Sequence, residues 1–183
     1  MKSIIKSLVF LALISCGQQK AATVESATEA APIGGGQSSV QDATSAPDVV
    51  RIAVGSPDHT TLVTALKTAE YVDALSNSGP FTVFAPTNAA FAKLPAGTVE
   101  NLLKPENKEA LRNILEYHVY VGVINEDYIQ DGMTLNQVNL DNVTLSKKEG
   151  KITVNGNNVL GSAKASNGIV YIIDGVLLPP AKK

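Results

Sequence analysis

Apolar residues recur at three- and four-residue steps through much of the stretch from residue 48 to residue 118. One such face consists of Leu62, Leu66, Ala69, Val72 and Leu75, and a later one of Leu111, Ile114, Leu115 and His118. This spacing places the apolar side chains on one side of a helix. The pattern therefore predicts several short amphipathic helices in this part of the chain.

Polar residues stand where these helices are expected to begin. Ser56-Pro57 combines a capping side chain with a proline at an early helical position. Thr87 or Asn88, then Thr98, then Asn107 can cap the helices that follow. We expect a chain of short, separately capped helices rather than one long helix.

The apolar period changes to two beyond residue 119. Residues 143–145 and 152–154 alternate apolar and polar side chains, which is typical of strands with one buried face. The segment Lys148–Lys151 between them predicts a hairpin tip, and Asn155-Gly156 and Asn167-Gly168 predict two more tight turns. Residues 169–173 are apolar throughout and predict a buried strand.

One earlier strand is expected at Phe81–Ala85, where aromatic and β-branched residues cluster before Pro86. Helices in the first half followed by antiparallel strands in the second half favour the α+β class. The pattern supports one domain over residues 48–180, with a short tail at residues 181–183.

The first sixteen residues predict an export signal. Lys2 and Lys6 are followed by the unbroken apolar run Leu8–Ile14, which is too short to span a bilayer. The segment Leu13–Cys16 resembles the lipobox of bacterial lipoproteins, which implies cleavage after residue 15 and lipidation of Cys16. The alternative is an ordinary signal peptide with a cysteine placed there by chance.

Residues 16–47 are rich in Ala, Thr, Ser, Gln and Gly and contain no aromatic residue. Such a segment cannot bury enough apolar surface to offset the entropy of ordering it. We expect a flexible linker between lipid and domain, with a reach on the order of 30 Å. A glycosylated stalk is the alternative.

The formal net charge is −2, and Lys147, Lys148 and Lys151 are the main basic group after the leader. We interpret these lysines as a solvated hairpin tip, because a nucleic-acid-binding face is far more basic. Cys16 is the single cysteine, so neither an internal disulfide nor a cysteine-based metal site is possible.

Candidate catalytic chemistry is sparse. The chain has two histidines, His59 and His118, and we expect His59 to be exposed in the first turn of a helix. Glu126, Asp127 and Asp131 could do acid–base work or hold calcium, but the start of a short helix at residues 125–127 is the better explanation of the first two. We therefore expect no catalytic residues, no metal and no cofactor.

Residues 79–91 resemble the first signature block of fasciclin (FAS1) domains, and residues 167–179 resemble the second. Tyr117-His118 is similar to the short element between these blocks. The residues that carry the resemblance, as structural or binding positions, are Phe81, Thr82, Phe84, Pro86, Thr87, Asn88, Phe91, Tyr117, His118, Gly168, Tyr171 and Asp174. The family most often has Asp at the position of Asn88, and either residue can cap a helix.

The resemblance implies a compact wedge of two small β-sheets packed with short helices, and a role in adhesion or extracellular binding. It implies no enzyme. Some animal members bind integrins through an Asp-Ile motif, which is absent from residues 160–165. We expect a monomeric, lipid-anchored module facing the periplasm or the cell exterior, with a protein or polysaccharide partner. A carrier of a carotenoid-like or lipid-like molecule is the alternative, and an esterase-like enzyme is a weaker one.

Tyr117 and His118 follow the apolar helical face that ends at Leu115. We expect both to be structural, with the His118 ring partly buried and one ring nitrogen bonded to a backbone group. The functional interpretation gives His118 a part in ligand binding or acid–base chemistry, since its ordinary pKa is near neutral.

Overall fold

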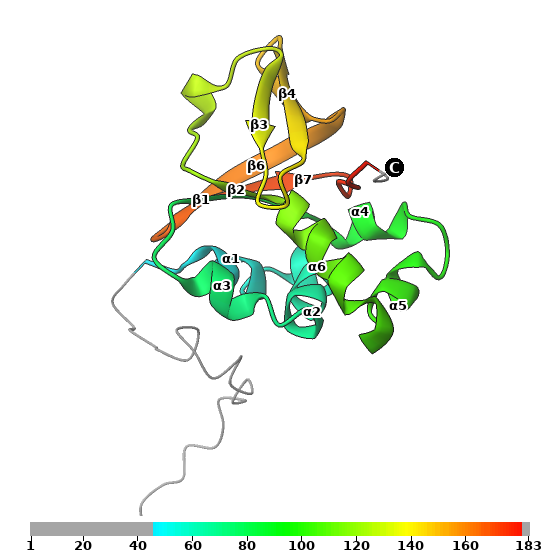
Figure 1. Ribbon diagram of the computed structural model, residues 1–183. Coiled ribbons are helices and arrows are strands. Elements are labelled where there is room, and N and C mark those ends of the chain that lie inside the picture. Colours follow the sequence, from blue (N-terminus) through cyan, green and yellow to red (C-terminus); the bar gives the residue numbers. More distant parts are fainter. Residues whose placement is uncertain (1–45, 181–183) are drawn as a thin grey trace, which may run out of the picture. The chain divides into compact units, whose positions relative to one another are not determined.

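The computed structural model describes residues 46–180. Its α-helices are α1 (Val49–Val54), α2 (Thr60–Thr68), α3 (Val72–Ser76), α4 (Asn88–Ala92), α5 (Thr98–Leu102) and α6 (Lys108–Tyr117). The 3₁₀ helices are η2 (Pro57–His59), η3 (Pro105–Asn107) and η4 (Glu126–Tyr128). The strands are β1 (Phe81–Pro86), β2 (Val119–Val121), β3 (Met133–Asn136), β4 (Asn142–Lys148), β5 (Lys151–Val154), β6 (Asn157–Ala165) and β7 (Gly168–Ile173). Helices gather on one side of the strands (Figure 1), so the α+β class is confirmed.

The two small sheets expected from the resemblance are joined into one. The seven strands follow the order β2-β1-β7-β6-β5-β4-β3. Strand β6 makes the connection, because Asn157 and Asn158 pair with β5 whereas Val159–Ala165 pair with β7. A shift in register between Val159 and Gly161 marks the place where β6 changes partners. Such a bulge bends a strand, and here it turns one half of the sheet away from the other.

The pairing of β1 with β7 is parallel, from Phe81 opposite Gly168 to Pro86 opposite Ile173. The other strand neighbours are antiparallel, as the sequence predicts. A parallel pair needs a long connection, and here the helices α4 to α6 and strands β2 to β6 all lie between the two strands. The parallel pair is a feature that local patterns do not reveal.

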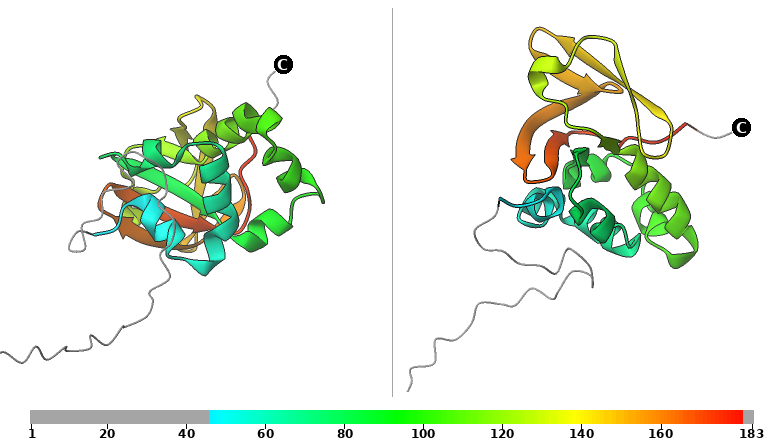
Figure 2. Two further views of the ribbon diagram at one scale, coloured as in Figure 1. Left: turned by 90° about the horizontal axis from the view of Figure 1, so that it is seen from below. Right: turned by 60° about the vertical axis from the view of Figure 1, so that its left-hand side comes forward.

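Both faces of the β1–β7 pair are buried, each in a different core. On one face Val83, Ala85 and Val170 pack against apolar residues of α1, α2, α3 and α6. On the other face Phe84 and Tyr171 pack against β3, β4 and β5. Figure 2 shows the helices covering one side of these strands. Burial on both sides explains why β7 is apolar throughout rather than alternating.

The two outer strands of the sheet, β2 and β3, approach each other near the end of α6. The backbone N–H of Val138 donates to the Val119 carbonyl oxygen at 2.9 Å, which joins the segment after β3 to β2. The sheet is therefore barrel-like. It curls around the second core, whose larger side chains include Tyr117, Leu145 and Ile152.

One of the predicted caps forms and three do not. Thr87 accepts a hydrogen bond from Ala90 N. Asp48, which was not predicted to cap a helix, accepts one from Arg51 N. The side chains of Ser56, Thr98 and Asn107 make no capping bond, so the prediction was wrong for these three. Gly97, at a φ of 81°, occupies the cap position expected for Thr98.

Asn88 caps a different helix from the one it begins. Its Oδ1 accepts from Thr61 N at 3.0 Å and from Thr60 Oγ1 at 3.2 Å, both in the first turn of α2. Its Nδ2 donates to the Pro57 carbonyl at 3.0 Å. An aspartate could accept the first two bonds but could not donate the third. Asn88 thereby ties α4 to the start of α2.

His59 is buried, with 3% of its surface exposed, so the expectation of an exposed ring was wrong. Its Nδ1 lies 2.8 Å from Ser56 Oγ, while Nε2 makes no hydrogen bond of good geometry. Burial lowers the pKa of His59, and the Asp58 carboxylate and the nearby Ala85 carbonyl oppose this shift. The ring is buried because η2 and α2 pack inward against α4, a contact that sequence position cannot show.

The predicted turns are present, with one difference. Glu149-Gly150 and Asn155-Gly156 all have positive φ, as tight hairpins require. Between β6 and β7 the turn is formed by Ser166 and Asn167, and Gly168 is already the first residue of β7. Gly168 is needed for space, because a Cβ there would overlap the Phe81 carbonyl oxygen of the neighbouring strand.

Replacing Gly168 by alanine should therefore destabilise the fold. Strands β1 and β7 would have to separate at the first pair of their register, and we expect the free energy of unfolding to fall by about 2 kcal/mol. Urea denaturation of the full chain measures the change. Gly161→Ala in β6 is the matched control, because a Cβ at Gly161 meets no atom within 4 Å. Equal stability of the two variants would contradict the steric argument.

Candidate interaction surface

Tyr117 lies inside the barrel-like half of the domain and connects three elements there. Its hydroxyl donates to the Asn142 carbonyl of β4 at 2.8 Å and accepts from Asn155 Nδ2 at 2.9 Å. The Asn155 Oδ1 in turn accepts from Thr144 N at 2.8 Å. Tyr117 therefore fastens the end of α6 to β4 and to the turn between β5 and β6.

His118 is bound at both ring nitrogens. Nδ1 lies 2.7 Å from the Ile114 carbonyl oxygen, and Leu177 N donates to Nε2 at 3.0 Å. A carbonyl can only accept and an amide N–H can only donate, so the ring must be neutral with its proton on Nδ1. His118 thus links the last turn of α6 to the segment that follows β7.

Burial lowers the pKa of His118 to about 4, and the hydrogen bond to Ile114 opposes this shift only in part. The apolar residues around the ring include Leu62, Leu115 and Val176. A general base must reach its substrate. With 3% of His118 exposed and both nitrogens occupied, this arrangement supports a structural role rather than acid–base chemistry.

Thr82 and Tyr171 hold the segment between β2 and η4 against the sheet. Thr82 Oγ1 donates to the Gly122 carbonyl at 2.7 Å and accepts from Ile124 N at 3.1 Å. The Tyr171 hydroxyl donates to the Ile124 carbonyl at 2.7 Å, and its ring stacks on Phe84 at a centroid distance of 6.0 Å. Burial raises the pKa of Tyr171 to about 12, with a smaller contribution from Glu126 and Asp127.

Asp174 fixes the start of the segment after β7. Its Oδ1 accepts from Asn158 N at 2.8 Å, its Oδ2 accepts from Asn158 Nδ2 at 2.9 Å, and Lys93 Nζ lies 3.6 Å from Oδ2. Hydrogen bonding from Asn158, with the nearby Lys93, lowers the pKa of this carboxyl group. The remaining motif residues pack: Phe81 against the helical core, Pro86 in full burial, and Phe91 against the helices around it.

Asn167 is a connecting residue that sequence reasoning took only for part of a turn. Its Oδ1 accepts from Val49 N of α1 at 2.9 Å. Its Nδ2 donates to the carbonyls of Leu75 at 2.7 Å and Asn77 at 2.8 Å, at the end of α3. Its own carbonyl accepts from Phe81 N at 3.0 Å. The signal available in the sequence was the Asn-Gly pair, and it pointed to a turn rather than to four distant partners.

The described residues supply no catalytic constellation. Ser56 does contact His59, but through Nδ1, and the buried Nε2 makes no hydrogen bond with a described residue. No group of three or more histidine, cysteine, aspartate or glutamate residues within 46–180 is placed to hold a metal ion. Asp131 instead accepts from Lys147 N, and Glu126 accepts from Ser162 Oγ.

The predicted leader, Cys16, most of the predicted linker and the tail at residues 181–183 lie outside the described residues. Within the described part of the chain, every helix is too short or too polar to cross a bilayer.

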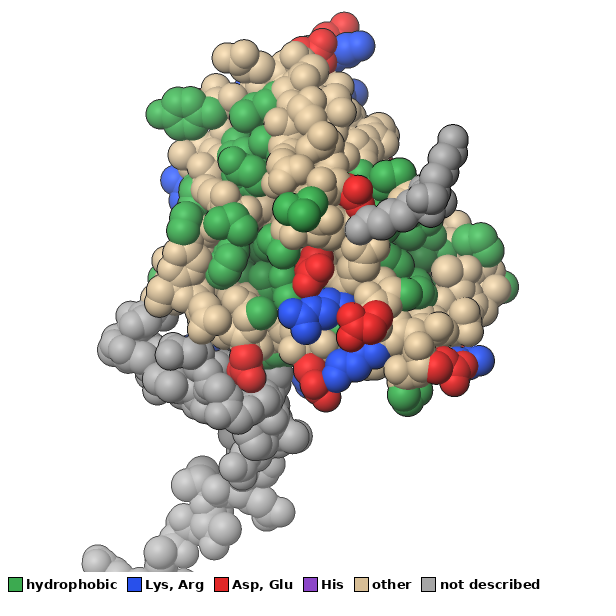
Figure 3. All heavy atoms as spheres, in the orientation of Figure 1, with side chains coloured by type: hydrophobic (Ala, Val, Ile, Leu, Met, Phe, Trp, Pro, Cys, Tyr) green, Lys and Arg blue, Asp and Glu red, His purple; other side chains and the backbone are tan. Residues whose placement is uncertain are grey.

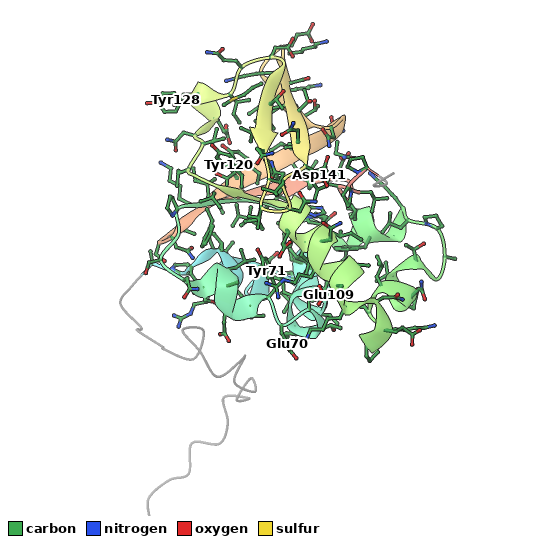
Figure 4. All side chains as sticks on the ribbon, in the orientation of Figure 1. Glu70, Tyr71, Glu109, Tyr120, Tyr128 and Asp141 are labelled. Carbon is green, nitrogen blue, oxygen red and sulfur yellow. The ribbon has the colours of Figure 1, made fainter. Side chains whose placement is uncertain are left out.

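The surface carries an apolar strip along the two outer strands of the sheet. We define it by Tyr120, Tyr128, Met133 and Leu140. Tyr128 is 70% exposed and Leu140 79%. Figure 3 shows hydrophobic side chains gathered over this side of the domain. In Figure 4 Tyr128 projects outward from η4, and Tyr120 lies on the same side.

Leu140 is held at the end of the strip in a rigid turn. It has a φ of 70°, which is uncommon for a leucine. Leu140 N donates to the Gln137 carbonyl, and Asn136 Nδ2 donates to the Leu140 carbonyl. Asn139 bonds Asp141 and Asn113 beside it. A strained backbone held by several bonds around an exposed apolar side chain is a feature that clusters at functional sites.

Comparison with known proteins agrees with this geometry. The family model described as the fasciclin domain matches residues 57–179. This is the class of protein that the helices, the barrel-like sheet and the buried motif residues define. The chain belongs to the fasciclin (FAS1) family.

Relatives of the chain are known from bacteria. It is 50% identical over 137 residues to "Protein sll1483" of Synechocystis, covering 74% of this chain and 76% of that protein. It is 40% identical over 153 residues to "Immunogenic protein MPB70" of Mycobacterium bovis, covering 80% of this chain and 76% of that protein. It is 37% identical over 139 residues to "Cell surface glycolipoprotein MPB83" of M. bovis, covering 73% of this chain and 61% of that protein.

A solved structure shares the fold. The FAS1 domain pair from the insect cell adhesion molecule fasciclin I aligns with a TM-score of 0.64 and 19% sequence identity. The match covers 72% of this chain and 51% of that chain. At this identity the likeness concerns the fold alone.

The buried His118 predicts a loss of stability in acid. Above about pH 6.5 the ring is neutral in both the folded and the unfolded chain, and its contribution is complete. As the pH falls from 6.5 toward 4, the unfolded chain takes up a proton that the folded chain excludes, so the free energy of unfolding decreases. The difference in pKa corresponds to a loss of up to about 3 kcal/mol.

Urea denaturation of wild type and His118→Gln between about pH 7 and pH 4.5 tests this. The variant should be less stable near neutrality, because it disturbs two buried hydrogen bonds, but it should lose less stability in acid. His59 and the carboxylates are common to both chains, so their titration cancels in the comparison. Parallel pH profiles would show that His118 is not responsible.

Proposed function

We propose that this chain is a non-catalytic binding module of the cell envelope, anchored by lipid at Cys16 and attached to a protein partner through the apolar strip. The observation that carries the proposal is the exposure of Tyr128 and Leu140 along the strip, on a domain whose family-motif residues are otherwise engaged in packing. Large apolar side chains that stay in water while grouped on one surface mark interaction sites.

The strip has the physical character of a protein-binding surface. Tyrosine and leucine supply large contact area, and aromatic residues are enriched at the centres of interfaces. Strand β2 is an outer strand of the sheet, and although Val138 N already occupies its Val119 carbonyl, the edge near Val121 carries further backbone groups that can pair with another chain. Since β2 spans only Val119–Val121, side-chain contacts rather than a long backbone ladder would supply most of the affinity.

Charges on α6 are largely paired within the domain. Lys108 Nζ lies 2.6 Å from Glu70 in the turn between α2 and α3, and Arg112 lies 3.0 Å from Glu116 and over the Tyr71 ring. Figure 4 shows Glu70, Tyr71 and Glu109 together among the helices. Exposed pairs of this kind contribute little to stability or attraction. The strip therefore offers the stronger driving force for association.

The anchor and the location are supported by the leader sequence and by relatives. The order of basic residues, apolar run, Ser15 and Cys16 is typical of an exported lipoprotein. One relative bears the printed name "Cell surface glycolipoprotein MPB83". A lipid on Cys16 and a flexible segment before Asp48 would hold the domain clear of the membrane, where a partner can reach the strip.

The two alternative functions, a carrier of a hydrophobic small molecule and an esterase-like enzyme, receive less support. Two apolar cavities among the helices each hold about 20 Å³, whereas sites for small molecules are usually several hundred Å³. A carotenoid-like or lipid-like ligand would require α2 and α6 to separate. An esterase-like activity would need a nucleophile with an accessible base, and the Ser56–His59 contact does not provide one.

The strip predicts that adhesion depends on exposed apolar side chains. The full chain is displayed on the surface of host bacteria, and the number of these cells that attach to cells of the source organism is counted. Host cells that carry the empty vector give the background level of attachment. The double variant Tyr128→Ser, Leu140→Asn should reduce attachment to the vector level. Both positions are exposed, and asparagine tolerates the positive φ at position 140, so the melting temperature should be unchanged.

Leu178→Ser is the matched control, because Leu178 is 52% exposed on the segment after β7, away from the strip. It should attach like wild type. If wild type and the double variant attach equally well, the strip is not the binding surface. If neither exceeds empty vector, the adhesion proposal itself fails.

The anchor predicts that wild type enters the detergent phase when a bacterial extract is partitioned, and that its first mature residue is an acylated Cys16. Several acyl chains on one residue make membrane attachment stable. The variant Cys16→Ser should remain in the aqueous phase. Mass spectrometry of the amino-terminal peptide provides the second measurement. A wild-type chain that stays aqueous and carries no acyl mass would contradict the proposal.

A further inference from the structure

A second surface feature lies apart from the strip, at the place where the described chain begins. It is an open cleft of about 650 Å³ between the start of α1, the turn from α3 to β1, the turn from β6 to β7 and the segment after β2. Polar and charged side chains that line it include Asp48, Arg51, Asn77, Asn125, Lys164 and Ser166. Its size falls within the usual range for small-ligand sites.

The cleft carries a net positive charge, whereas the described domain as a whole carries a net negative charge. Residues 46–180 contain ten lysines and arginines against fourteen aspartates and glutamates, a net charge of −4. The cleft has Arg51 and Lys164 against Asp48 alone. Both carboxylate oxygens of Asp48 already interact with Arg51, because Oδ1 accepts from Arg51 N at 2.8 Å and Oδ2 lies 3.9 Å from Arg51 Nε. The ammonium group of Lys164, in contrast, has no partner among the described residues.

Several neutral polar groups of the cleft are also unused. Within residues 46–180 the side-chain amides of Asn77 and Asn125 make no hydrogen bond. Ser76 lines the same cleft, and its hydroxyl is buried without a partner in that range. A buried hydroxyl with no partner costs free energy unless water or a ligand completes it. The cleft therefore offers a lysine, two amides and a hydroxyl to an incoming molecule.

The arrangement discriminates among anions. Two amides at the start of α1 are occupied, Val49 N by Asn167 Oδ1 and Arg51 N by Asp48 Oδ1, so the helix does not offer these two to a phosphate. One unpaired lysine matches a single negative charge better than a dianion. Amide and hydroxyl side chains suit a ligand rich in hydroxyl groups, and the apolar wall around Pro80 and Ile169 can contact the carbon face of such a ligand.

We propose that this cleft binds a uronic acid unit of an acidic polysaccharide. Lys164 pairs with the sugar carboxylate, and Asn77 and Asn125 form hydrogen bonds with its hydroxyl groups. None of the residues that define the protein-binding strip lines the cleft, so the two sites are independent. With both surfaces, the module can hold an envelope polymer and a protein at the same time.

Isothermal titration of the full chain with trigalacturonic acid tests the site, with the trimethyl ester of the same sugar as the matched ligand. The ester keeps the ring hydroxyls and loses the charges. We expect the acid to bind, and the ester to bind at least about tenfold more weakly, because a hydrogen bond to a charged group is stronger than one between neutral groups. Equal binding of acid and ester, or no binding of the acid, would overturn the proposal.

Variants distinguish specific binding in the cleft from nonspecific attraction between the acidic sugar and surface lysines. Lys164→Gln and Asn77→Ala should each weaken binding of the acid, the first by about tenfold. Lys151→Gln, at the hairpin tip and outside the cleft, removes the same charge and should leave binding unchanged. An equal loss in Lys151→Gln and Lys164→Gln would overturn the site. The strip variant should bind the sugar like wild type, so this result is distinct from the outcome of the adhesion assay.

Discussion

The parallel pairing of β1 with β7 is the interaction on which the rest of the structure depends. It brings the two family-motif blocks together, since β1 lies in the first and β7 in the second. Both faces of the pair are buried, one under the helices and one inside the barrel-like half of the sheet. The close approach requires a glycine at position 168, because any Cβ there would overlap the backbone of Phe81.

The segments that surround this pair are fixed by buried hydrogen bonds from a few side chains. Tyr171 and Thr82 hold the segment after β2, Tyr117 holds β4, and His118 holds the segment after β7. Each such group would be costly to leave unpaired, so these contacts select one arrangement of loops over others. The motif residues therefore determine the shape of the domain, while the exposed residues of the proposed strip lie outside the motifs.

This division has a consequence for function within the family. A shared fold does not specify a ligand. The strip and the cleft are formed by residues such as Tyr128, Leu140 and Lys164, which lie outside the residues that carry the family resemblance. Two members can thus keep the same interior and present different surfaces.

Local patterns in the sequence were informative wherever the physical cause was local. The helical face of Leu111 and Leu115, the hairpin tip at Glu149-Gly150 and the turn at Asn155-Gly156 depend on neighbours a few residues away. Caps were less predictable: Thr87 forms its bond, but Asn107 does not. A capping side chain can find another partner in the folded chain, as Asn107 does with the Asn101 carbonyl.

The sequence by itself determined the α+β class, the family, the short helices and most of the turns, because spacing and turn chemistry act over a few residues. Only the tertiary structure decided which strands pair in parallel, that His59 is buried and that Asn167 joins α1 to α3. It also decided where exposed residues gather into a strip and a cleft. These features depend on contacts between segments far apart along the chain. Such contacts produce no periodic pattern of apolar and polar residues, so the sequence alone does not reveal them.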